Sequence, residues 1–162
     1  MFTFKNPIFV LTMLATLGCA LMSGVFFAFS TFVMKGLGRI PANEGIAAMQ
    51  SINQVVPGSV FGAAFVVTPL LCLAAMIGAI WQWNEAGSIY ILAGSIIYLL
   101  TALAVTLVLN IPLNNSLAAI TANAPESAAF WIDYQNSWNW WNHVRTLGSL
   151  ASTVAFIFAL LR

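Results

Sequence analysis

Residues 131–146 read WIDYQNSWNWWNHVRT, and this stretch determines how the rest of the chain is interpreted. It contains four of the six tryptophans, the only histidine, His143, and the cation Arg145. From Thr146 to Leu161 the chain carries no charge. Tryptophan is enriched where a transmembrane helix meets water, and polar side chains inside a membrane face the protein interior. The stretch therefore predicts the mouth of a transmembrane helix, with polar groups carried about one turn inward.

The composition excludes a soluble domain. The chain has 162 residues, of which 61% are hydrophobic and only 6% are charged, and its mean hydropathy is +0.94. Soluble domains carry about a quarter charged residues. The net charge of +1 provides no basic surface for nucleic acid, so we expect no nucleic-acid partner.

Four runs are apolar and long enough to cross a membrane, since about 20 helical residues span a hydrocarbon core of about 30 Å. We place them at about residues 8–34, 57–81, 88–111 and 140–161. Backbone groups in lipid must bond within the protein, so the spans are predicted to be helices. Short loops between them predict an all-α, integral membrane, four-helix up-down bundle, forming a single domain over residues 1–162 with both termini on one side.

Three local patterns refine this fold. After Pro41, the apolar side of residues 42–53 predicts a short interfacial helix in the first loop. Pro112 is expected to bend or end the third span. Residues at a spacing of four predict a buried face on the first span and another on the third. These residues are Thr16, Ala20, Gly24 and Ala28, and then Tyr90, Gly94, Tyr98, Ala102, Thr106 and Asn110.

An up-down bundle brings the unusual polar residues to one membrane face. The end of the first span, the start of the second, the end of the third and the start of the fourth share that face. It holds the short helix with Gln50 and Asn53, the Asn110–Asn114 corner and the tryptophan-rich stretch. Any functional site is therefore expected at this mouth, with His143 close to the Asn110-Pro112-Asn114 corner.

The residue types at the mouth leave several roles open. His143 could be a general base, a metal ligand or a hydrogen-bonded structural residue. A second histidine and a nearby cysteine are both lacking, so we expect no metal centre, although haem or metal ligation by His143 stays open. Arg145 either extends to the interface or clamps an oxygen-rich ligand. The asparagines either tie helices together or hold a ligand carbonyl, and tryptophans could wall a pocket for a flat ring.

Several motifs resemble those of the DUF1772 or anthrone oxygenase family of small bacterial membrane proteins, over nearly the whole chain. The motifs are Gly24-Val-Phe-Phe-Ala-Phe-Ser30 with Met34, Met49-Gln50 with Asn53, Asn110-Ile-Pro-Leu-Asn114, and Trp138-x-x-Trp141-Asn142-His143-x-Arg145-Thr146. The resemblance implies an integral protein of the bacterial inner (plasma) membrane. Relatives in polyketide pathways oxidise anthrones to anthraquinones with dioxygen.

The resemblance also implies a cofactor-independent scheme, in which a base removes a proton and donors stabilise the enolate that reacts with dioxygen. His143 would be the base, and Asn110, Asn139 and Arg145 would be the donors. The substrate-binding residues would be Gln50, Asn53, Asn114, Trp138, Trp141 and Asn142.

Two functional hypotheses remain open from the sequence. The first is a membrane-embedded oxygenase or oxidase that acts on a flat lipophilic aromatic substrate, anthrone- or quinol-like, with dioxygen. The alternative is a non-catalytic membrane protein, either a structural subunit or a protein that binds quinones or lipids. In both, the partners are the lipid bilayer and a lipophilic small molecule, and a homo-oligomer is compatible with the sequence.

Overall fold

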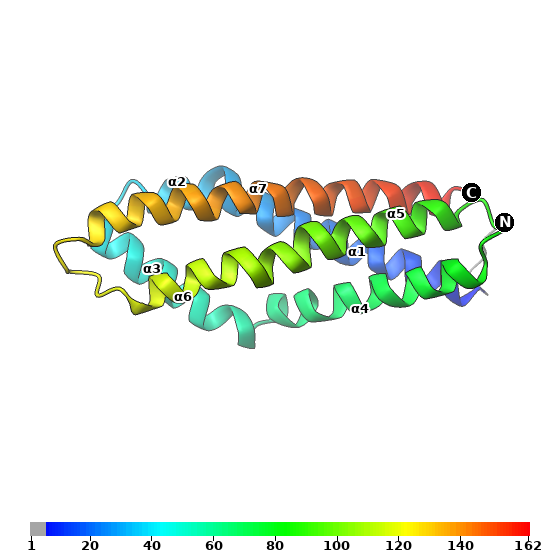
Figure 1. The fold of residues 1–162 in the computed structure, drawn as a ribbon, viewed down its shortest axis with the longest axis horizontal. Helices are drawn as coiled ribbons and strands as arrows, with labels where there is room; N and C mark the ends of the chain where they lie inside the picture. Colours follow the sequence, from blue (N-terminus) through cyan, green and yellow to red (C-terminus); the bar gives the residue numbers. More distant parts are fainter. Residues whose placement is uncertain (1–5) are drawn as a thin grey trace.

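The computed structural model describes residues 6–162, and within them it is a bundle of long helices without strands (Figure 1). In chain order the elements are α1 (Pro7–Ala28), η1 (Phe29–Val33), α2 (Met34–Leu37), α3 (Ala42–Val55), η2 (Val56–Gly58), α4 (Val60–Trp81), α5 (Ser88–Tyr98), η3 (Leu99–Ala104), η4 (Thr106–Asn110), α6 (Ile111–Ala119) and α7 (Ser127–Leu160). Here η1, η3 and η4 are π-helical turns and η2 is a 3₁₀ turn.

Four continuous helical stretches are long and apolar enough to cross a membrane. They are Pro7–Leu37, Val60–Trp81, Ser88–Ala119 and Ser127–Leu160. The start of α1 and the end of α7 lie at the same end of the bundle, as Figure 1 shows, so the predicted four-helix fold and the shared side of its first and last helix ends are confirmed. α1 packs against α4 and α7, and α5 packs against the same two helices. The chain is therefore a membrane protein.

The core near the chain ends is built from small and sulfur-containing side chains. Cys19, Met22, Cys72, Tyr98 and Phe156 are fully buried there. The Sγ atoms of Cys19 and Cys72 lie 3.9 Å apart, and both residues are free thiols. Buried thiols of this kind pack as small apolar groups, which is consistent with their place in uncharged helices.

The other end of the bundle is a helical cap that consists of α2, α3, α6 and residues 127–138 of α7. α7 has 34 residues, so it is roughly 51 Å long, well beyond a hydrocarbon core of about 30 Å. Ile46 and Met49 of α3 are buried against Trp131, Tyr134 and Trp138 in a second apolar cluster. The predicted short helix is confirmed, and its apolar side faces α7.

Of the two effects expected of Pro112, a bend or an end of the third helical stretch, the end is wrong. The backbone N–H of Ile111 donates to the carbonyl of Thr106, five residues earlier, so a π turn precedes the proline. Pro112 then occupies the first turn of α6, where its missing N–H costs nothing. The helix continues to Ala119, and Asn114 is thereby carried into the cap.

The two predicted small-residue faces have different outcomes. The face of the third stretch is confirmed, since Gly94, Tyr98, Ala102, Thr106 and Asn110 are all buried. The prediction of a buried small-residue face on the first span is wrong. Ala20 and Gly24 are exposed, and a Cβ at Gly24 would meet no described atom within 4 Å. The buried face of α1 instead carries Thr12, Ala15, Cys19, Met22, Ser23 and Phe26.

Gly148 provides a test of this packing. A Cβ at Gly148 of α7 would overlap the side chain of Thr101 in η3. We expect Gly148→Ala to destabilise the protein by about 1–3 kcal/mol, because a branched side chain on a packed helix has little room to move. The measurement is the thermal unfolding midpoint of detergent-purified protein. Gly24→Ala is the matched control, and equal midpoints for the two variants would contradict the packing of α7 on η3.

Candidate functional site

A pocket of about 700 Å³ lies where the cap meets the four-helix bundle. Its walls come from the end of α1 with η1, from α3 and η2, from the start of α4, from η4 and α6, and from α7. The residues that line it are Val25, Phe26, Phe29, Met49, Gln50, Ile52, Asn53, Gln54, Val56, Pro57, Phe61, Gly62, Phe65, Val66, Thr106, Ile111, Asn114, Asn115, Ala118, Trp138 and Arg145. This volume is in the range of sites that hold a small organic ligand.

Aromatic rings form much of the pocket wall. The rings of Phe26 and Phe61 meet edge to face with centroids 6.2 Å apart, and those of Phe29 and Trp138 lie 5.7 Å apart. Phe65 adds a further ring from α4. Such walls favour a flat apolar ligand, since aromatic surfaces give large contact areas and prefer stacked or edge-to-face arrangements.

Arg145 is the single cation in this wall, and it is 5% exposed. One terminal nitrogen donates to Thr106 Oγ1 at 3.2 Å and the other to Asn142 Oδ1 at 2.7 Å. The guanidinium carbon lies 4.5 Å from the ring centre of Phe26 and 5.0 Å from that of Trp138. Its Nε has no hydrogen-bond partner among the described residues. The cation is thus buried and oriented by two hydrogen bonds, while its Nε has no partner among the described residues.

The charge of Arg145 meets no carboxylate within residues 6–162. The chain has four acidic residues, Glu44, Glu85, Glu126 and Asp133, and all four are exposed. The partners of Arg145 are neutral oxygens and aromatic faces. Removing a charge from water costs several kcal/mol when no opposite charge replaces the water. An unpaired buried cation of this kind is chemically suited to pair with an anionic or electron-rich oxygen.

The amide of Asn142 holds Arg145 in position. Its Nδ2 donates at 2.7 Å both to the carbonyl oxygen of Phe26 and to Ser30 Oγ. Both hydrogens of this amide are therefore used on the side of α1 and η1, and the amide oxygen, Oδ1, is turned toward Arg145 and accepts its hydrogen bond. Thr106 Oγ1 donates to the carbonyl oxygen of Ala102 at 2.7 Å, which leaves its lone pairs to accept from Arg145. The acceptors that orient the cation are thus fixed by backbone groups on α1 and η3.

The Asn110–Asn114 corner holds Trp138 rather than a histidine. Asn114 Oδ1 accepts hydrogen bonds of 2.9 Å from Tyr134 Oη and from Trp138 Nε1. Asn110 Nδ2 donates at 3.2 Å to the carbonyl oxygen of Trp138. Asn110 does not line the pocket, whereas Asn114 and Trp138 do. The corner therefore fixes the indole that covers the Arg145 guanidinium.

α3 closes the pocket with two polar residues. Gln50 Nε2 donates to the carbonyl oxygens of Leu117 at 2.8 Å and Ile120 at 3.0 Å, and so ties α3 to the end of α6. Asn53 Nδ2 is buried without a hydrogen-bond partner in the described part of the chain. Asn53 Nδ2 and Arg145 Nε are thus two unused donors from residues of the same wall.

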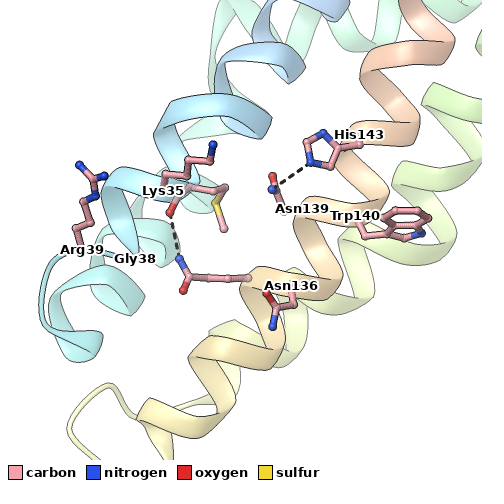
Figure 2. Close-up of a pocket in the computed structure, with 9 residues that line it drawn as sticks. Lys35, Gly38, Arg39, Asn136, Asn139, Trp140 and His143 are labelled. Carbon is pink, nitrogen blue, oxygen red and sulfur yellow. Dashed lines mark hydrogen bonds between the residues drawn. The ribbon is translucent and has the colours of Figure 1, made fainter.

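His143 lies elsewhere, and the expectation that it sits inside the bundle near the Asn110 corner is wrong. Residues two apart on an α-helix point about 200° away from each other, so a buried Arg145 turns His143 outward. His143 is exposed, and Asn139 Nδ2 lies 3.4 Å from its Nε2 on the outer side of α7 (Figure 2). Trp141 is half-buried and does not line the 700 Å³ pocket.

Sequence reasoning missed several residues of the site. Phe26, Phe61 and Phe65 were indistinguishable from lipid-facing apolar residues in uncharged runs. Ser30 lay inside a family-like motif without an assigned role. Thr106 was predicted to be buried, but its bond to Arg145 depends on the π turn of η4. Within residues 6–162, no group of three histidine, cysteine or acidic side chains is close enough to hold a metal ion.

Replacing Arg145 by methionine tests whether the cation stabilises the fold. We expect Arg145→Met to leave the thermal unfolding midpoint unchanged or higher, because an apolar side chain of similar length removes the desolvation cost of an unpaired charge. Unfolding of detergent-purified protein, followed by tryptophan fluorescence, measures this. A fall of the midpoint by several degrees would instead make Arg145 a structural residue.

Comparison with known proteins bears on these same motifs. A sequence profile of the anthrone oxygenase family matches residues 57–155, which is well over half of the chain. The match includes the Asn110–Asn114 corner and the helix with Trp138, Asn142 and Arg145. No curated protein and no solved structure matches the chain. The chain belongs to the anthrone oxygenase family.

Proposed function

We propose that the chain is an oxygenase or oxidase of the bacterial plasma membrane that acts on a flat lipophilic aromatic substrate, anthrone- or quinol-like, with dioxygen. The observation that carries this proposal is Arg145, a buried cation without a carboxylate partner in an aromatic-walled pocket. Membership of the anthrone oxygenase family supports the same reaction class.

The reaction needs an anion at the substrate oxygen. Loss of a proton from the CH₂ group of an anthrone gives an enolate, which transfers electrons to dioxygen. One oxygen atom forms the new carbonyl of the anthraquinone, and the other leaves as water with both hydrogens of the CH₂ group. Atoms and electrons balance with dioxygen as the oxidant. The protein then has to favour the enolate, because the neutral anthrone reacts slowly.

Arg145 is suited to stabilise this enolate oxygen. Its Nε forms no hydrogen bond within the described part of the chain, and Asn53, which also lines the pocket, carries a second such nitrogen, Nδ2. Fixed donors aimed at a developing oxyanion in a dry site contribute about 3–4 kcal/mol each to transition-state stabilisation. Phe26, Phe61 and Trp138 would flank the rings of the substrate.

The pocket also suits a substrate that arrives from the bilayer. Val66 of α4 and Ile111 of α6 line it and are 60% and 38% exposed, respectively. Both belong to helical stretches that are long and apolar enough to cross a membrane. A lipophilic molecule could therefore enter sideways between α4 and α6 without passing through water.

The decisive experiment compares Arg145→Gln with Arg162→Gln. We expect Arg145→Gln to lower anthrone-dependent oxygen uptake by about 100-fold or more, because the enolate loses its counter-charge. Arg162→Gln, at the opposite end of the bundle, should retain wild-type uptake. Membranes with equal amounts of each variant are assayed with an oxygen electrode, and membranes without the protein correct for spontaneous oxidation. Equal rates for both variants would refute the role of Arg145.

The base assignment of His143 stays a prediction that His143→Gln tests separately. His143 does not line the Arg145 pocket, so we expect this variant to retain most of its oxygen uptake, with the substrate proton leaving to water. A variant that accumulates normally and loses its activity would restore His143 as the base.

The non-catalytic alternative predicts a different result from the same preparation. A wild-type protein that binds an anthraquinone or quinone, as followed by its optical spectrum, but consumes no oxygen with an anthrone would be a binding protein. An enzyme and a binding protein would hold a similar ligand in the same pocket, so only a measurement of oxygen consumption distinguishes the two functions.

A further inference from the structure

A second hollow, of about 470 Å³, lies between α7 and the end of the first helical stretch at α2 (Figure 2). Its lining residues are Met34, Lys35, Gly38, Arg39, Gln135, Asn136, Asn139, Trp140 and His143. It shares no lining residue with the Arg145 pocket. Figure 2 shows Lys35 and His143 facing one another across it, with Arg39 at its outer edge.

The hollow is positively charged. Lys35 and Arg39 are two of the five basic residues of the chain, and both are exposed. None of its lining residues, all within the described part of the chain, is an aspartate or glutamate. Two unpaired cations on one concave surface attract an anion, and a phosphate ester accepts from ammonium and guanidinium groups together.

The neutral side chains of the hollow add donors. When Asn139 Nδ2 donates to His143 Nε2, at 3.4 Å, the neutral imidazole carries its proton on Nδ1 and can donate it to a ligand. Asn136 is exposed on the same side of α7. The hollow therefore offers amide and imidazole donors beside the two cations.

The floor of the hollow is already closed by packing. Gln135 Nε2 donates to the carbonyl oxygen of Met34 at 3.1 Å, which joins α7 to the end of the first helical stretch. A Cβ at Gly38 would lie 2.8 Å from Gln135 Nε2, so the absence of a side chain at this position permits the contact. The hollow thus keeps its shape without a ligand.

The sequence around the hollow is typical of the level where a transmembrane helix meets lipid headgroups. The uncharged part of α7 from Thr146 to Leu160 continues away from the hollow into the membrane-crossing bundle. Trp140, 65% exposed, lines the hollow, and exposed tryptophans mark the level of lipid headgroups. Basic residues between helices at this level bind anionic headgroups.

We propose that this hollow binds the phosphate of an anionic phospholipid, with Lys35 and Arg39 neutralising the charge and Trp140 contacting the lipid at the interface. A free phosphate would satisfy the same cations, but it would make no use of Trp140. The site lies apart from the Arg145 pocket, so it does not depend on the function proposed there.

The test measures how added ligands change the thermal unfolding midpoint of detergent-purified protein. The ligands are dioctanoyl phosphatidylglycerol, dioctanoyl phosphatidylcholine and inorganic phosphate at equal concentrations. We expect phosphatidylglycerol to raise the midpoint of the wild type by roughly 3 °C at ten times its half-saturating concentration, and the other two to leave it unchanged. Lys35→Gln combined with Arg39→Gln should abolish the rise, whereas Arg162→Gln should retain it.

Three outcomes would overturn the proposal. Equal rises with phosphatidylglycerol and phosphatidylcholine would show that headgroup charge is not recognised. An equal rise with inorganic phosphate would assign the site to the free ion. A rise that persists in the double variant would place the lipid elsewhere. If the double variant does not accumulate, each single variant is judged by the same criterion.

Discussion

The arrangement of the pocket residues is governed by one constraint, which is to hold the positive charge of Arg145 in an apolar environment without an opposite charge. Burial of a cation costs several kcal/mol. The two hydrogen bonds to Thr106 and Asn142 contribute about 1.5–3 kcal/mol each, and the faces of Phe26 and Trp138 add up to about 2 kcal/mol each. These contributions are comparable to the cost, so the cation is tolerated with its Nε still unused. A ligand oxyanion would then add stabilisation that the protein's own groups do not supply.

Two π turns, η1 and η4, place the residues that orient this cation. An extra residue in a turn rotates every later side chain by about 100° relative to a regular helix, and such turns are frequent at functional sites. η1 contains Ser30, which fixes the Asn142 amide, and η4 contains Thr106. Both hydroxyls depend on these turns for their positions.

The uncharged runs and the shared mouth were predictable, because span length and alternation of direction fix them. Which face of each helix points inward was not. Residues four apart drift by about 40° per step in an α-helix, so the regular spacing around Gly24 did not stay on one side. Along the third stretch the π turns reduced this drift, which kept Tyr98 and Asn110 on the same buried face. His143 and Arg145, two residues apart, could not both face inward, and a single sequence does not reveal which one does.

The family motifs acquire one physical meaning in this arrangement. The two asparagines of Asn110-Ile-Pro-Leu-Asn114 hold the backbone and the indole of Trp138, and that indole covers the Arg145 guanidinium. Asn142, from the second motif, supplies the acceptor for the same cation. Motif residues on two helices therefore converge on one guanidinium. These contacts all surround the unpaired guanidinium of Arg145, and none of them reaches His143.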